Sequence, residues 1–154
     1  MSDDDAGWAV RPRLAGCMDD HPGEPSGKAI VVDGNNVIAS VPDGWWLDRP
    51  AAVRRLLGRL ACYRQRTGDS VILVLDVPQQ DLPPGVHDGV EVCYPRRRGR
   101  DAADERILEL LDERDLGDVE VVSSDRALAA GARQRRAGVV GAGAFLARLD
   151  RSRC

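Results

Sequence analysis

The stretch Ala29-Ile30-Val31-Val32-Asp33 decides the fold, because four aliphatic residues in a row end on an aspartate. Two later runs also end on aspartates, at Asp76 after residues 71–75 and at Asp125 after residues 119–124. Short aliphatic runs separated by helical patterns are typical of parallel strands buried on both faces. Ligands of such sheets bind beyond the carboxyl ends of the strands. We therefore expect the three aspartates to converge at one edge of a sheet.

The sequence between these runs predicts an alternating order of strands and helices. The predicted strands are 28–33, 70–76, 90–94, 118–123 and 139–140, and the predicted helices are 49–66, 101–114, 125–137 and 144–151. The segment with the two tryptophans after the first strand and residues 77–89 are predicted as loops, the second because of its three prolines and two glycines. Alternation of this kind predicts an α/β fold with a mainly parallel sheet.

Length and charge divide the chain of 154 residues into a tail and one domain. Residues 1–27 contain six acids and two arginines without sustained periodicity, so we expect a disordered acidic tail before a domain at 28–154. The chain has neither an apolar run long enough to cross a bilayer nor a signal pattern at its N-terminus. A cytoplasmic protein is therefore expected.

The four cysteines, Cys17, Cys62, Cys93 and Cys154, are widely scattered. No pair has the short spacing of a zinc site, and a chain of this size does not need disulfides. We expect reduced thiols, with Cys62 and Cys93 packed inside.

Each acidic residue, taken singly, has a structural interpretation. Asp33 before glycine and Asp76 before Val-Pro could form turns, whereas Asp101 and Asp125 could cap helices. Three strand ends that share an aspartate, with Asp104 on a following helix, favour a common site instead. Clustered carboxylates repel one another unless a cation lies between them, and hard cations such as Mg²⁺ or Mn²⁺ prefer oxygen ligands.

Other acid-based α/β sites fit the sequence poorly. Lys28 is the only lysine, and it precedes the first strand. A phosphate-binding loop needs Gly-Lys-Ser/Thr, and receiver domains or haloacid-dehalogenase-type phosphatases need a lysine late in the sheet. The segment Gly34-Asn35-Asn36 also lacks the glycine pattern of a dinucleotide-binding fold.

Four motifs in matching order resemble the YacP-like branch of the NYN domain, within the PIN-like nucleases. They are residues 32–38 (VDGNNVI), 74–76 (VLD), 103–107 (ADERI) and 122–126 (VSSDR), and the likeness covers about residues 28–150. The resemblance implies a PIN-like, Rossmann-like three-layer α/β/α sandwich. It also implies a metal-dependent endoribonuclease, with Mg²⁺ or Mn²⁺ as cofactor.

The resemblance also implies roles for individual residues. Asp33, Asp104 and Asp125 match the acidic metal-site positions, and Asp76 matches a further acidic position. Asn36 matches the asparagine that supports the first aspartate, and Ser123 and Ser124 match the hydroxyl positions before the last one. Asp101 and Glu105 match possible auxiliary ligands. The chain departs from the family where Val77 and Pro78 follow Asp76, since glycine is common there.

The expected partner is RNA, single-stranded or ribosome-associated, and it must approach an acidic site. Arginines beside the acids are expected to contact phosphates, namely Arg96, Arg97, Arg98, Arg100 and Arg126. Trp45 and Trp46 could stack on an unpaired base or cover the first helix. The alternative function is a catalytically inactive RNA-binding or scaffolding module of the same fold.

Overall fold

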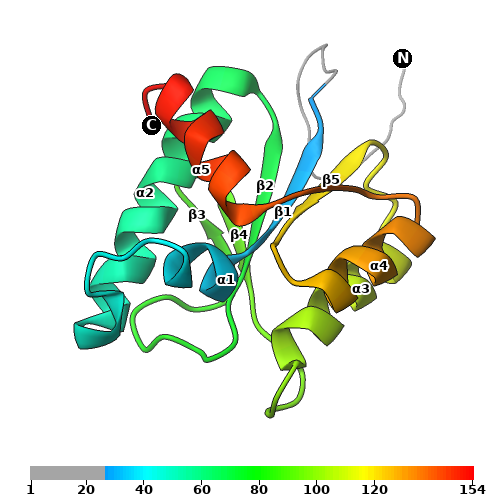
Figure 1. Ribbon diagram of the computed structural model, residues 1–154, viewed down its shortest axis with the longest axis horizontal. Coiled ribbons are helices and arrows are strands. Elements are labelled where there is room, and N and C mark those ends of the chain that lie inside the picture. Colours follow the sequence, from blue (N-terminus) through cyan, green and yellow to red (C-terminus); the bar gives the residue numbers. More distant parts are fainter. Residues whose placement is uncertain (1–26) are drawn as a thin grey trace, which may run out of the picture.

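The computed structural model describes residues 27–154, which form a six-stranded sheet with helices on both faces (Figure 1). The strands are β1 (Ala29–Asp33), β2 (Ser70–Val74), β3 (Gly85–His87), β4 (Val90–Cys93), β5 (Val119–Val122) and β6 (Gly138–Val140). Their order is β3-β4-β2-β1-β5-β6, and all neighbours are parallel except β3 and β4. The predicted acidic tail, with Cys17, lies outside the described residues except for Gly27.

Helices cover the sheet in two groups. Helices α1 (Gly34–Ala39), α2 (Arg49–Thr67) and α5 (Ala142–Arg151) pack on one face with Ile30 and Val32 of β1. Helices α3 (Ala102–Glu113) and α4 (Arg126–Gln134) pack on the other face with Val31. Successive side chains of a strand point to opposite faces, so β1 contributes to both cores and is fully buried. The predicted three-layer α/β/α sandwich is confirmed.

Local sequence sets the ends of α2. The side chain of Asp48 accepts a hydrogen bond from the Ala51 backbone N–H, and Pro50 lies in the first turn, where a missing N–H costs no helical hydrogen bond. Gly68 ends the helix with a φ of 79°, a left-handed conformation that glycine adopts without a steric penalty. The predicted helix over 49–66 is thus confirmed to within one residue.

Three short elements lie in segments predicted as loops. Helix α1 and the 3-10 helix η2 (Trp45–Leu47) follow β1, and β3 lies within 77–89. Helix α1 has only six residues and begins Gly-Asn-Asn, so it has no readable helical period. The β3–β4 hairpin turns at Asp88 and Gly89, both with positive φ, and Asp-Gly is itself a strong hairpin signal that the prolines nearby obscured.

The prediction that all cysteines are reduced is wrong for Cys62 and Cys154, which form a disulfide with Cα atoms 5.7 Å apart. The chain end after α5 lies against α2, where Arg59 donates from Nε to the Cys154 carbonyl oxygen over 2.8 Å. The two cysteines are 92 residues apart, so only the folded chain brings them together. Cys93 is a buried free thiol, as predicted, and burial raises its pKa to about 11.

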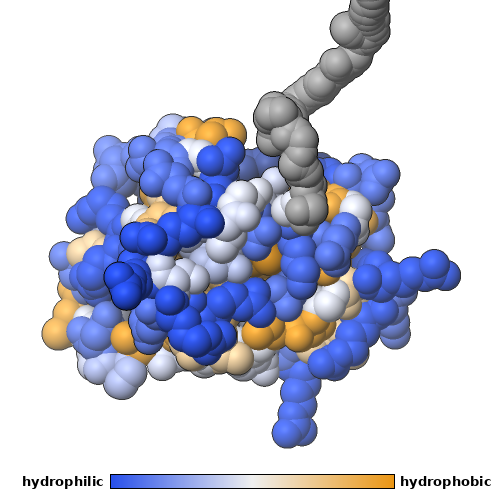
Figure 2. Space-filling view, turned by 90° about the horizontal axis from the view of Figure 1, so that it is seen from above, coloured by the Kyte–Doolittle hydropathy of each residue, from blue (hydrophilic) through white to orange (hydrophobic). Residues whose placement is uncertain are grey.

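The surface of the described residues is mainly polar. The face that Figure 2 shows from above is mostly hydrophilic, and its hydrophobic residues form small, separate groups. The exposed large hydrophobic residues are Trp46, Leu47, Val77 and Val86. No helix within residues 27–154 has the length and apolarity needed to cross a membrane.

Candidate active site

Asp33 ends β1 at the point where the order of the strands in the sheet reverses. The connection from β1 to its neighbour β2 runs through α2 on one face of the sheet. The connection from β4 to β5, the other neighbour of β1, runs through α3 on the opposite face. Such a reversal between neighbouring parallel strands opens a crevice beyond their carboxyl ends. The Asp33 side chain is largely buried there, since the residue is only 5% exposed. A buried carboxylate therefore lies where folds of this class bind their ligands.

Two hydrogen-bonding side chains join the ends of β1 and β5. The Ser123 hydroxyl, also buried, donates to Asp33 Oδ2 over 2.9 Å and accepts from the Asp125 backbone N–H over 3.1 Å. Asn36 Oδ1 accepts from the Ser124 backbone N–H over 2.8 Å. The Asn36 side chain thus fixes the backbone before Asp125, and the Ser123 hydroxyl holds Asp33. A backbone hydrogen bond from Asn36 also lowers the pKa of Asp33, and the supporting role of Asn36 stays a prediction.

Asp125 and Asp104 reach this edge from helices on one face of the sheet. Asp125 is the N-cap of α4, and its Oδ1 accepts from the Leu128 backbone N–H over 2.9 Å, so the structural alternative that the sequence left open for Asp125 is present. Asp104 lies half-buried in the first turn of α3. Asp101 precedes α3 with a φ of 64° and makes no side-chain cap, and Glu105 pairs with Arg97. The carboxylate of Glu105, expected as an auxiliary ligand, is therefore paired with an arginine.

Asp76 also lies at this edge, beyond the end of β2, but it has a cationic partner. Its Oδ1 forms an ion pair with Arg49 Nη2 at 3.0 Å, and its backbone N–H donates to Asn35 Oδ1 over 2.8 Å. These contacts join the end of β2 to the starts of α1 and α2. Asp76 is thus an acid whose charge a neighbouring arginine already balances.

The other acids of the edge perturb one another. Burial raises the pKa of Asp104 to about 6, with further contributions from the negative charges of Asp33, Asp125 and Asp101. Burial also raises the pKa of Asp33, against the lowering effect of the Ser123 hydrogen bond, and Asp125 and Asp76 raise it further. These carboxylates are close enough to repel, and within residues 27–154 no arginine forms an ion pair with Asp33, Asp104 or Asp125.

The donor chemistry of this edge fits a hard divalent cation. The acids offer only oxygen ligands, and a bound cation would offset the burial and the neighbouring negative charges that raise the pKa values of Asp33 and Asp104. Within the described part of the chain, however, no three His, Cys, Asp or Glu side chains are grouped closely enough to hold one ion. Ligation by Asp33, Asp104 and Asp125 together therefore requires side-chain movement toward a common point.

The predicted RNA-binding arginines divide into two groups. Arg96 pairs with Glu113 at 2.5 Å, and Arg97 pairs with Glu105, so both have acidic partners on α3. Arg98, Arg100 and Arg126 are exposed and form no ion pair with any residue in 27–154. The second group is the one whose positive charge is available to a phosphate.

The two tryptophans have different environments. Trp45 is half-buried against the core that includes α2, with the Arg49 guanidinium 6.0 Å from its ring centre. Trp46 is 61% exposed and meets Trp45 edge to face, with ring centres 5.9 Å apart. Of the two predicted roles, covering the helix suits Trp45, whereas stacking on a base suits Trp46.

Sequence reasoning missed three residues that shape the site. They are Gly34, Asn35 and Arg49, of which the last two contact Asp76. A Cβ atom on Gly34 would lie 2.7 Å from Leu75 Cδ2 and 3.0 Å from the Val74 carbonyl oxygen. Only glycine therefore lets α1 turn so closely over the end of β2. The Asp-Gly-Asn-Asn motif contained this information, but it resembles an ordinary turn.

Comparison with known proteins gives a consistent result. The family model of the YacP-like NYN domain matches residues 30–154. A crystal structure of Rae1 (YacP) from Bacillus subtilis is similar with a TM-score of 0.65 and 25% identity, over 82% of this chain and 75% of that chain. The structure of a single-residue mutant of the same protein gives a TM-score of 0.66 and 24% identity, over 82% and 76%. No curated protein matches the sequence.

Proposed function

The chain belongs to the YacP-like NYN domain family, a ribonuclease-type family, and from this premise we propose that it is a metal-dependent endoribonuclease. The observation that supports this proposal most directly is that Asp33, Asp104 and Asp125 lie at the switch point of the sheet without an ion pair in residues 27–154. Burial and neighbouring acids raise the pKa values of Asp33 and Asp104 there. Burial of a carboxylate without a cationic partner costs stability unless hydrogen bonds compensate for it. A bound cation would compensate the negative charge of these acids.

Asp33, Asp104 and Asp125 would hold the Mg²⁺ or Mn²⁺ ion. When bound, the ion supplies positive charge that activates water and stabilises the charge on the phosphate in the transition state. Ser123 fixes one oxygen of Asp33, and the Asn36 contact with Ser124 fixes the backbone that carries Asp125. This machinery needs neither a histidine nor a protein nucleophile.

RNA would approach along the exposed arginines Arg98, Arg100 and Arg126, whose guanidinium groups match phosphate oxygens. Trp46 would stack on an unpaired base, which favours a single-stranded segment over a helix. Ribosome-associated RNA as the substrate stays a prediction. The cytoplasmic location also stays a prediction, and the Cys62–Cys154 disulfide is a feature rare in that compartment.

Cleavage of end-labelled RNA in Mn²⁺ or Mg²⁺ tests the proposal. We expect wild-type protein to cut internally, EDTA to stop the reaction, and both Asp33→Asn and Asp125→Asn to abolish it. Asp118→Asn is the matched control, because Asp118 is exposed just before β5, at the opposite end from Asp125. Metal-dependent cutting that survives in Asp33→Asn would contradict the assignment.

One observation favours the alternative of an inactive RNA-binding module, namely that no three acids in residues 27–154 are grouped to hold an ion. This alternative predicts equal RNA binding by wild type and Asp33→Asn, without cleavage by either protein in any divalent metal. Filter binding beside the cleavage assay separates the two functions.

A further inference from the structure

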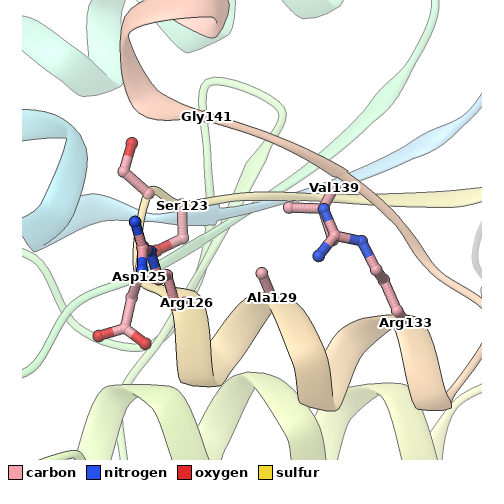
Figure 3. A pocket seen from close by; sticks show the side chains of 8 residues that line it. Ser123, Asp125, Arg126, Ala129, Arg133, Val139 and Gly141 are labelled. Carbon is pink, nitrogen blue, oxygen red and sulfur yellow. The ribbon is translucent and has the colours of Figure 1, made fainter.

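A hollow beside the acidic edge has the composition of a nucleotide site. It has a volume of about 500 Å³ and is lined by Ser123, Ser124, Asp125, Arg126, Ala129, Arg133, Val139 and Gly141 (Figure 3). Small-molecule sites in proteins measure roughly 300–1,000 Å³. The hollow lies between α4 on one side and the ends of β5 and β6 on the other. It therefore adjoins the carboxylate of Asp125 but extends away from it.

Two guanidinium groups lie along this hollow. Arg126 and Arg133 are seven residues apart on α4, which places them on one face of the helix about 10 Å apart along its axis. Figure 3 shows their guanidinium groups on either side of the Ala129 methyl group, whereas the Asp125 carboxylate points away from it. Neither arginine forms an ion pair with a residue in 27–154, whereas Arg135, the C-cap of the same helix, pairs with Asp112 at 2.8 Å. Positive charge is thus available at both ends of the hollow.

A hydroxyl group completes the polar lining. Ser124 Oγ accepts from the Ala142 backbone N–H over 2.9 Å, and its hydroxyl hydrogen has no acceptor among the described residues. Between the polar groups the wall is formed by Ala129, Val139 and Gly141, which are small or apolar. Ser124 is exposed, so this hydroxyl is accessible from the hollow.

We propose that this hollow binds the nucleotide next to the scissile phosphate. The phosphate on one side of this nucleotide contacts Arg126 and the Ser124 hydroxyl, and the phosphate on its other side contacts Arg133. Its sugar and base lie between them and cover Ala129 and Val139. The identity of the ligand rests on the proposed function, since a ribonuclease must hold the chain on at least one side of the bond that it cuts. Binding of a nucleotide would also explain why Arg126 and Arg133 form no ion pair with acids in residues 27–154.

Nucleotide binding to the metal-free, full-length protein tests the site without cleavage. In EDTA we titrate ¹⁵N-labelled protein with 5′-AMP, 3′-AMP and adenosine, and follow the amide signals of Ser124, Ala129 and Gly141. At least one monophosphate should shift these signals, and adenosine should bind several-fold more weakly. Arg133→Ala should weaken binding about tenfold, the usual cost of one charge-assisted hydrogen bond. Arg66→Ala, an exposed arginine in the last turn of α2, should not.

Two further measurements separate this proposal from the function itself. Ala129→Leu fills the hollow and should abolish the shifts, with circular dichroism confirming that the protein still folds. With RNA as substrate, Arg133→Ala should raise KM about tenfold and leave kcat within about twofold.

The outcomes are distinct. RNA cleavage by a protein whose hollow responds to neither monophosphate, or equally to adenosine, would overturn the subsite but not the function. Shifts that depend on Arg133 in a protein that cuts no RNA would support the nucleotide site and overturn the nuclease.

Discussion

The pKa values of the carboxylates shift in opposite directions at the acidic edge and among the arginines around α3. On α3, Glu113 lies beside Arg96 and Arg106, and the Arg96 hydrogen bond lowers its pKa. Glu91 on β4 likewise accepts two hydrogen bonds from Arg114, which lower its pKa. At the carboxyl edge, burial and neighbouring acids raise the pKa of Asp104 instead. Residues 28–154 contain as many arginines as acids, 19 of each, so the contrast supports the proposal that this edge keeps its negative charge for a ligand.

The largest expected effect concerns catalysis. Asp33→Asn or Asp104→Asn should lower kcat for RNA by about 100-fold or more, because each change removes a ligand charge from the metal. Glu113→Gln, which changes an acid of the arginine-paired group in the same way, should leave kcat within about twofold. Steady-state cleavage in Mn²⁺ measures both. Similar losses in the two groups would mean that the contrast has no functional meaning.

The acids of the edge and the arginine-paired acids should also change the stability of the protein in opposite directions as pH rises, measured in EDTA. Burial raises the pKa of Asp104 to about 6 in the folded protein, against an ordinary value of 3.8. The folded state therefore holds the extra proton, and stability falls as pH rises between these values. The hydrogen bonds from Arg114 lower the pKa of Glu91, so its contribution to stability is present above the ordinary value of 4.5 and is lost as pH falls.

Thermal melts from pH 3 to 8 check these limbs. Asp104→Asn should flatten the decline above pH 4, and Glu91→Gln should flatten the loss at lower pH. A decline above pH 4 that is unchanged in Asp104→Asn would place its origin elsewhere in the protein.

At neutral pH without metal, the same substitutions should change the free energy of unfolding with opposite signs. Glu91→Gln should cost about 1 kcal/mol, since the pair with Arg114 is bidentate but about one third exposed. Asp104→Asn should stabilise the protein, because it removes repulsion. Urea unfolding at pH 7.5 measures both changes, and destabilisation by Asp104→Asn would show that this carboxylate has a favourable partner.

The smallest expected effect separates paired from unpaired arginines. Arg98→Ala should reduce the slope of log K against log salt for RNA binding by about one, the value for one lost phosphate contact. Arg97→Ala should change the slope less, since Glu105 already occupies its guanidinium. Equal changes in the two variants would mean that RNA displaces Glu105.

The sequence predicted the sheet edge well because the information is local. Each aliphatic run that ends on an aspartate specifies a strand, and parallel strands bring their carboxyl ends together without any further detail. Helix α1 and β3 were missed because six and three residues are too few to show a period. The Cys62–Cys154 disulfide and the Arg96–Glu113 pair depend on segments that meet only in the folded chain. The side-chain contacts of Asn36 likewise depend on how α1 lies over β5.

A crystal soaked in Mn²⁺ tests the central claim most directly. The anomalous difference map should contain a peak bounded by the carboxylates of Asp33, Asp104 and Asp125, and the peak should be absent from Asp33→Asn crystals soaked in the same way. Mn²⁺ bound only at other acids, with these three carboxylates still apart, would contradict the account.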